Sequence, residues 1–104
     1  MKLSFGYITT PTKQEAKEIV LELMEEGLIA CANIVDGAES YFVWDNEINQ
    51  AKETLIFFKT RAKNEDKVIK VVKSMHSYEC PCIVFSNLEH GNMDFLRWVE
   101  NCCS

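Results

Sequence analysis

The alternation of apolar and polar positions over the first quarter of the chain predicts one strand followed by one helix. Aromatic and β-branched residues are frequent in residues 3–9, which we expect to form a strand. Apolar residues then recur at helical spacing over residues 13–26, with charged residues between them. Thr12 and Glu15 have the spacing of a capping box at the start of this helix. Gly27 is suited to end it, because glycine tolerates the left-handed backbone conformation.

The next stretch predicts two long antiparallel strands, residues 31–44 and residues 47–60. The Asp-Asn pair at residues 45–46 is the expected hairpin turn, because both residue types accept positive φ. The Asp-Gly pair at residues 36–37 is expected to form a bulge or bend inside the first of these strands.

The second long strand is apolar on both faces. Leu55 and Phe57 point to one side of it, and Ile56 and Phe58 point to the other. A strand of this kind needs cover on both faces, and the chain has too few helices to provide it. A second copy of the chain would supply the missing cover, which places Ile56, Phe57 and Phe58 at an interface between copies.

The rest of the chain predicts a helix, a short strand and a closing helix. Asn64 is the expected N-cap of the helix, whose apolar stripe ends at Met75. Residues 82–85 read as a buried strand, residues 87–92 as a turn, and residues 93–99 as a short helix.

The predicted order of elements is therefore β-α-β-β-α-β-α. The first six elements match the ferredoxin-like split βαβ arrangement, an α+β fold with an antiparallel sheet and a long central hairpin. A chain of 104 residues has room for one hydrophobic core, so residues 1–104 are expected to form a single domain.

Charge and hydropathy narrow the classes of partner. The formal net charge is −5, and Lys and Arg form no cluster, so binding to nucleic acid is not expected. No apolar run reaches the length of a membrane span, so no membrane partner is expected. The first eleven residues are too short and too polar for a signal peptide, which predicts a cytoplasmic location.

Five cysteines support the same location. An odd number cannot form a complete set of disulfides within one chain, and a reducing compartment with free thiols is the simpler interpretation. These cysteines are Cys31, Cys80, Cys82, Cys102 and Cys103.

Five segments occur along the chain in a fixed order: ITTP, LIACANIVDGAESYFVW, ETLIFFKT, HSYECPCIVFSNLEHGN and FLRWVE. In this combination they resemble the CutA family of divalent-cation tolerance proteins over essentially the whole chain. The resemblance implies a ferredoxin-like subunit in a tight homotrimer, with no catalytic reaction and no obligatory cofactor. It also implies a link to copper and other divalent metal ions. A homotrimer would account for the strand that is apolar on both faces.

The segment HSYECPC at residues 76–82 carries the candidate metal ligands. Copper favours imidazole and thiolate ligands, so His76 and Cys82, assisted by Glu79, are the predicted ligands of Cu²⁺ or another divalent metal. The alternative is structural: Pro81 would set the loop, Cys82 would be an apolar strand residue, and His76 would end the second helix.

Four residues, of which Glu79 is also a candidate metal ligand, form a candidate ligand cleft. The resemblance brings Trp44, Lys59, Tyr78 and Glu79 toward a cleft at a subunit boundary. A ring, a cation, a phenol and a carboxylate could orient a small polar ligand there. The alternative is a packing and hydrogen-bonding cluster at the interface itself, because Tyr and Trp are common at interfaces.

Two functions follow from these features. The first is a non-enzymatic homotrimer involved in divalent-cation tolerance or binding. The second is a trimeric regulatory or small-ligand-sensing protein that uses the cleft between subunits. A metallochaperone with the same subunit fold would carry a C-x-x-C motif after the first strand, but residues 9–12 read Thr-Thr-Pro-Thr.

Overall fold

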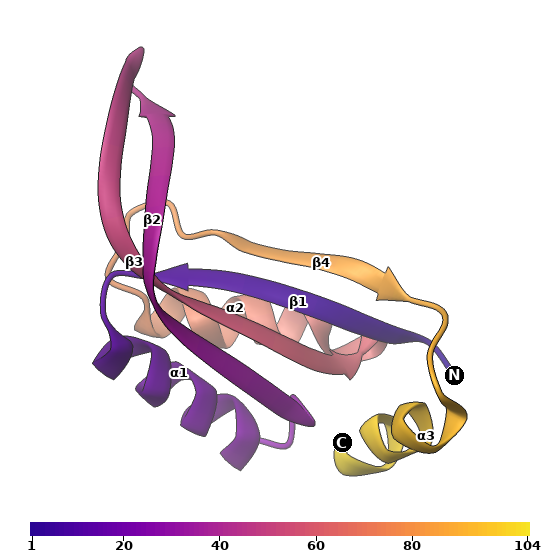
Figure 1. Cartoon of the computed structure of the whole chain (residues 1–104). Coiled ribbons are helices and arrows are strands. Elements are labelled where there is room, and N and C mark those ends of the chain that lie inside the picture. The colour runs from indigo at the N-terminus through magenta and orange to yellow at the C-terminus, as the bar shows by residue number, and fades with distance from the viewer.

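A four-stranded antiparallel sheet organises the chain in the computed structural model, which describes residues 1–104 (Figure 1). The strands lie in the order β2-β3-β1-β4. The elements along the chain are β1 (Leu3–Thr10), α1 (Lys13–Glu25), β2 (Cys31–Trp44), β3 (Glu47–Arg61), a 3-10 turn (Ala62–Asn64), α2 (Glu65–Met75), β4 (Ile83–Leu88) and α3 (Met93–Cys102). The α+β class and the predicted order of elements are confirmed. None of the helices is long and apolar enough to cross a membrane.

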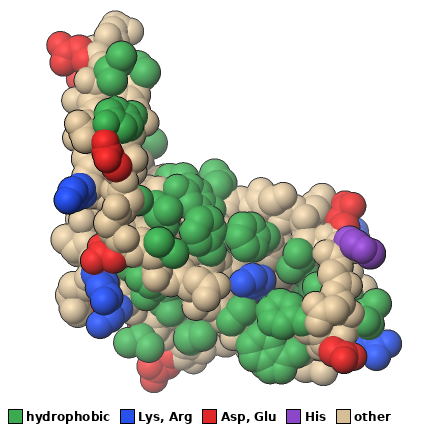
Figure 2. Space-filling view, in the orientation of Figure 1, with side chains coloured by type: hydrophobic (Ala, Val, Ile, Leu, Met, Phe, Trp, Pro, Cys, Tyr) green, Lys and Arg blue, Asp and Glu red, His purple; other side chains and the backbone are tan.

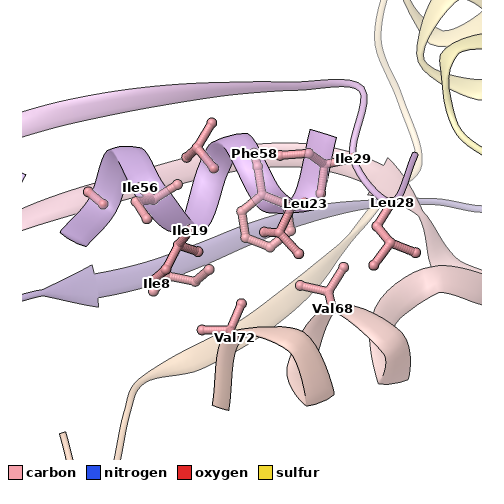
Figure 3. Close-up of a cluster of buried hydrophobic side chains, with 11 residues drawn as sticks. Ile8, Ile19, Leu23, Leu28, Ile29, Ile56, Phe58, Val68 and Val72 are labelled. Carbon is pink, nitrogen blue, oxygen red and sulfur yellow. The ribbon is translucent and has the colours of Figure 1, made fainter. Parts of the chain in front are cut away.

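The main core lies between the sheet and the two helices α1 and α2, which lie on the same side of it (Figure 1). Figure 3 shows the buried side chains that meet there; the core includes Ile8, Ile19, Leu23, Ile56, Phe58, Val68 and Val72. Gly6 of β1 lies under the ring of Phe58, and a Cβ at this glycine would come within 2.1 Å of that ring. The close approach of strand and ring therefore requires glycine.

Ile56 and Phe58 were predicted to lie at an interface between copies, and this placement is corrected. Both side chains are fully buried in the chain's own core. Alternate residues of a strand point to opposite faces, and the face that carries Ile56 and Phe58 is the one covered by α1 and α2. Of the three predicted interface residues, only Phe57 lies on the other face.

The only helix that reaches the other face of the sheet is α3, which packs against Leu3 at one end of β1. Phe57 packs there against Phe5 and Tyr7, with ring centroids 5.8 Å and 5.2 Å apart. Val84 of β4 is 52% exposed beside them, opposite Tyr7 in the ladder. We call this surface the open face of the sheet.

Strands β2 and β3 continue beyond the rest of the sheet as a projecting hairpin (Figure 1). The register of the pair shifts between Val35 and Ala38, and Gly37 within the shift has a φ of +79°. This confirms the predicted bulge, which bends the pair. The turn is also as predicted, because Asp45 and Asn46 have φ values of 53° and 61°. We call residues 38–53, beyond the bulge, the hairpin arm.

The ends of the helices agree with the sequence in part. The Thr12 side chain accepts a hydrogen bond from the Glu15 backbone N–H at 3.1 Å, and Gly27 follows α1 with a φ of +71°. Asn64 precedes α2 as predicted but makes no capping hydrogen bond. Its side-chain amide instead donates a hydrogen bond to the Leu28 carbonyl at 3.3 Å, which joins the start of α2 to the loop after α1.

The last two elements are the edge strand β4 and the helix α3. Strand β4 begins at Ile83, one residue after the predicted start, and runs on to Leu88 in the segment predicted to be a turn. Helix α3 packs Leu96 and Val99 against Leu3 in a second, smaller core. The main core therefore lies only on the side of the sheet that α1 and α2 cover. The hairpin arm and the open face around Phe57 stay accessible.

Candidate functional site

A groove of about 690 Å³ lies between the hairpin arm, β1 and the loop that joins α2 to β4. Figure 2 shows hydrophobic side chains gathered on the hairpin arm and beside its foot. The lining residues are Tyr7, Thr9, Ser40, Tyr41, Phe42, Val43, Trp44, Ala51, Glu53, Tyr78, Glu79, Cys80 and Cys82. The groove therefore combines aromatic walls with carboxylates, hydroxyls and thiols.

The pleat and the bulge together place these side chains. Tyr7 and Thr9 alternate with the core residue Ile8 on β1, so they point to the open face. Glu53 reaches the same face from β3, where it pairs with Ala38 just beyond the bulge. The bend at the bulge then carries the arm's aromatic residues to the side of the groove.

The phenol of Tyr78 and the carboxylate of Glu53 form the central polar contact. Tyr78 Oη donates a hydrogen bond to Glu53 Oε2 at 2.7 Å, and Glu53 is only 9% exposed. Burial raises the pKa of Tyr78 to about 12, reinforced by the hydrogen bond to Glu53 and by the nearby carboxylate charges. Burial also raises the pKa of Tyr7, with smaller contributions from Cys82 and Glu53. Both phenols are therefore protonated near neutral pH.

The thiol of Cys82 is affected in the same direction. Burial raises its pKa, and the charge of Glu53 adds to the shift. A thiol must lose its proton to become a strong metal ligand. Cys82 is therefore held in its weaker form as a ligand at neutral pH.

His76 is buried and fully engaged. Its side chain is 0% exposed, and its two ring nitrogens contact the backbone: Nε2 lies 2.7 Å from the Thr9 carbonyl oxygen, and Nδ1 accepts from the Tyr78 N–H at 3.1 Å. A ring with its proton on Nε2 satisfies both contacts. Glu15 Oε2 lies 3.4 Å from Nδ1 and also accepts from the Ser77 N–H. His76 thus fastens the loop to β1 and α1.

The structural alternative for His76 is correct in position but not in detail. The residue does follow α2, and its backbone N–H donates to the Val72 carbonyl at 2.8 Å. Its ring, however, bonds a carbonyl of β1 rather than the last carbonyls of the helix.

The three predicted metal ligands do not form a metal site within one chain. His76 points into the interior with both ring nitrogens occupied, whereas Glu79 and Cys82 line the groove. No group of three or more His, Cys, Asp or Glu side chains in the chain is arranged to hold a metal ion. The residues present within one copy therefore do not fit a preformed copper centre.

Three of the four predicted cleft residues do meet. Trp44, Tyr78 and Glu79 all line the groove, but Lys59 does not. Lys59 lies six residues after Glu53 on β3, where it pairs with Phe5 of β1. Its Nζ is 5.8 Å from the centroid of the Phe5 ring and 3.3 Å from Asn33 Oδ1. Within one chain the cleft therefore lacks the predicted cation.

Two important groove residues were missed by the sequence interpretation, Glu53 and Tyr7. A signal for Glu53 was present, because it shares a face of β3 with Leu55 and Phe57 at spacings of two and four residues. A carboxylate beside two apolar residues on a strand face is a polar group in need of a partner.

The whole chain is similar to proteins of one family. The sequence model of the CutA1 divalent ion tolerance protein matches residues 4–102. The divalent-cation tolerance protein CutA of Archaeoglobus fulgidus is 40% identical over 97 residues, which cover 93% of this chain and 94% of that protein. The structure of the same organism's protein, described as periplasmic, has a TM-score of 0.92 at 39% identity and covers 96% of this chain and 97% of that chain.

Structures from other organisms agree along the chain. CutA1 from Oryza sativa has a TM-score of 0.96 at 31% identity and covers all of this chain and 95% of that one. Cut A1 from Thermus thermophilus has a TM-score of 0.95 at 33% identity, with 98% and 99% covered. The fold, the order of the motifs and all three comparisons agree: this chain belongs to the CutA1 divalent ion tolerance protein family.

Proposed function

We propose that this chain forms a homotrimer that acts in tolerance of divalent cations, including Cu²⁺, without catalysing a reaction. The observation that carries the assembly is the apolar surface that one copy leaves uncovered. This surface consists of the open face around Phe57 and the hairpin arm, where Tyr41, Phe42, Val43, Trp44 and Ile48 are between 43% and 82% exposed.

Uncovered apolar surface of this kind is typical of an interface between proteins. We expect sedimentation equilibrium to give three times the chain mass of 12.0 kDa at micromolar concentration. A well-folded monomer under these conditions would contradict the proposal.

For the cations, we propose sites that form where carboxylates of different copies meet. The support is that one copy has 16 acidic and 11 basic residues but no three-ligand cluster of its own. Relatives of this chain carry the name of divalent-cation tolerance proteins. We expect calorimetric titration with Cu²⁺ to give tighter binding to the assembled protein than to a monomeric variant. Equal affinities would contradict a site shared between copies.

The proposal that the chain catalyses no reaction is based on the chemistry of its two histidines. Both ring nitrogens of His76 are bonded to the backbone, so this residue is not free to act as a general base. His90, the other histidine, lies in an exposed turn after β4. Purified protein is expected to leave generic ester and phosphoester substrates unchanged, and measurable turnover would contradict this part of the proposal.

A second candidate function is a trimeric regulatory or small-ligand-sensing protein, and the groove favours it. Its volume of about 690 Å³ and its mixture of aromatic and polar walls are those of a small-molecule site. The test is native mass spectrometry of protein purified without a tag, in which a co-purifying small molecule would support this candidate.

A cytoplasmic location is proposed because all five cysteines are free. The support is chemical: Cys80 and Cys102 are exposed and would oxidise readily in an oxidising compartment. Trapping of thiols with a maleimide in intact cells, followed by mass spectrometry, is expected to find them reduced, and a disulfide would contradict the location.

A further inference from the structure

We propose that the groove binds an organic ammonium ion, that is, a protonated amine joined to an apolar group. The ammonium would lie against the carboxylates of Glu53 and Glu79, and the apolar group would lie against the aromatic residues of the hairpin arm. This inference rests on the second candidate function, the ligand-sensing protein, and names the class of its ligand.

The charges around the groove point to a cation. Of the thirteen lining residues, Glu53 and Glu79 are acidic, and none is Lys, Arg or His. Lys59, the cation predicted for the cleft, lies outside the lining and bonds Asn33 within its own chain. A ligand that enters the groove therefore meets negative charge with no compensating positive charge from this copy.

Glu53 is the residue that points most directly to a cation. Its side chain is nine-tenths buried, and Oε2 accepts the Tyr78 hydrogen bond. Its other oxygen, Oε1, accepts no hydrogen bond within the chain but is not fully buried, and the carboxylate takes part in no ion pair. Oε1 is therefore open to an incoming donor, and a cation placed beside this largely buried carboxylate would form a charge-assisted contact with it.

The negative charge of Glu53 acts on the neighbouring groups of the groove. Glu53 contributes to the raised pKa values of Tyr7, Tyr78 and Cys82, which all line the groove. A potential that opposes a second negative charge on these groups favours a positive charge among them.

The apolar part of the ligand follows from the walls. Phe42 and Trp44 of the arm, on the same face of the hairpin as Glu53, and Tyr7 of β1 line a groove of about 690 Å³. Aromatic rings bury an apolar group and also attract an ammonium ion to their faces. A bare metal ion would use neither property, because it needs several oxygen, nitrogen or sulfur ligands close together.

The test uses three probes of similar shape and different charge: 2-phenylethylammonium, 2-phenylethanol and 3-phenylpropionate. Calorimetric titration of the full-length protein is expected to rank the ammonium first, at least about tenfold tighter than the alcohol, with no binding of the carboxylate. In a nitrogen-proton spectrum the indole signal of Trp44 should shift with the ammonium, whereas that of Trp98 on α3 should not. Binding of the alcohol as tight as that of the ammonium would overturn the proposal.

Variants locate the site. Glu53→Gln keeps an acceptor for Tyr78 but loses the charge, and we expect it to weaken ammonium binding at least about tenfold. Trp44→Leu, at a half-exposed position, should also weaken binding without loss of the fold. Glu89→Gln is the matched control, because Glu89 is an exposed carboxylate outside the groove lining and should bind as the parent protein does. Equal affinities for Glu53→Gln and Glu89→Gln would overturn the proposal.

The cation could instead come from a neighbouring copy, and Lys59→Gln separates the two cases. If 2-phenylethylammonium binds only after Lys59→Gln, the groove is filled by a lysine of a second copy and the small-molecule proposal is wrong. Sedimentation in the same buffer tests the homotrimer separately from the ammonium site. A trimer that ignores all three probes refutes the ammonium site alone, whereas a monomer refutes the homotrimer whatever the titration shows.

Discussion

Tyr78 donates a hydrogen bond to Glu53 across 2.7 Å and thereby joins the loop after α2 to the middle of β3. The two residues are 25 positions apart in the sequence. On the other side of the same loop, the ring of His76 contacts the Thr9 carbonyl on β1. The loop that walls the groove is therefore fixed to two strands, and the groove is preformed in one copy.

The Tyr78 hydroxyl is expected to contribute to stability. Tyr78→Phe leaves the nearly buried Glu53 carboxylate without its donor, which should lower the free energy of unfolding by about 1–3 kcal/mol. Urea denaturation at a fixed protein concentration measures the change. Tyr41→Phe is the control: its hydroxyl bonds Glu39 on the exposed arm, so its loss should cost less than about 0.5 kcal/mol. Equal losses would show that burial of Glu53 does not govern the effect.

Alkaline pH should reveal the same contact. The pKa of Tyr78 is raised from 10.0 to about 12, so the folded protein holds this proton more tightly than the unfolded chain does. The contribution to stability is complete below pH 10 and is lost as the pH rises toward 12. Absorbance of phenolate at alkaline pH should show that one of the three tyrosines, Tyr78, ionises last, at about pH 12.

Glu53→Gln tests the cause of that shift. The substitution removes the negative charge but leaves the phenol buried, so the pKa of Tyr78 should fall and still stay above its ordinary value. An unchanged late phenol in Glu53→Gln would assign the entire shift to burial.

Phe57 is expected to control assembly rather than folding. Phe57→Asp places a charge on the open face, where an interface with another copy would cover it at a cost of several kcal/mol. We expect a lighter species in sedimentation, with the far-ultraviolet circular dichroism of the parent. Phe57→Leu, which keeps an apolar side chain, should retain the parent's mass. An unchanged oligomer in Phe57→Asp would place the interface elsewhere.

The next residue along the strand should behave in the opposite way. Phe58 is fully buried under α1 and α2, so Phe58→Ala is expected to lower the free energy of unfolding by about 3–5 kcal/mol through the cavity it leaves. Thermal unfolding of the two variants side by side measures the contrast. If Phe57→Leu loses as much stability as Phe58→Ala, the assignment of the two faces is wrong.

The hairpin turn gives a test with little packing involved. Asn46 is exposed and has a φ of 61°, a conformation that a β-branched residue adopts at a cost of about 1–2 kcal/mol. Asn46→Val should therefore destabilise the protein, whereas Asn46→Gly should be close to neutral. Chemical denaturation of both variants gives the comparison, and equal stabilities would contradict a strained turn.

The helices and strands could be predicted from the amino-acid sequence because their signals are local. Helical spacing, the turn at residues 45–46 and the bulge at residues 36–37 each depend on neighbours a few positions apart. They predicted the order of elements, and strand and helix ends fell within a few residues of the observed ones. Alternation along β3 also showed that Phe57 and Phe58 lie on opposite faces.

Which of those faces is covered, and which distant groups meet, depends on how the elements pack in three dimensions. The two helices cross the face of Ile56 and Phe58, and this choice leaves Phe57 open. Periodicity cannot specify it, because both faces of the strand are equally apolar. The contacts of His76 and Glu53 likewise join residues far apart in sequence, so they exist only once the sheet has brought the strands together.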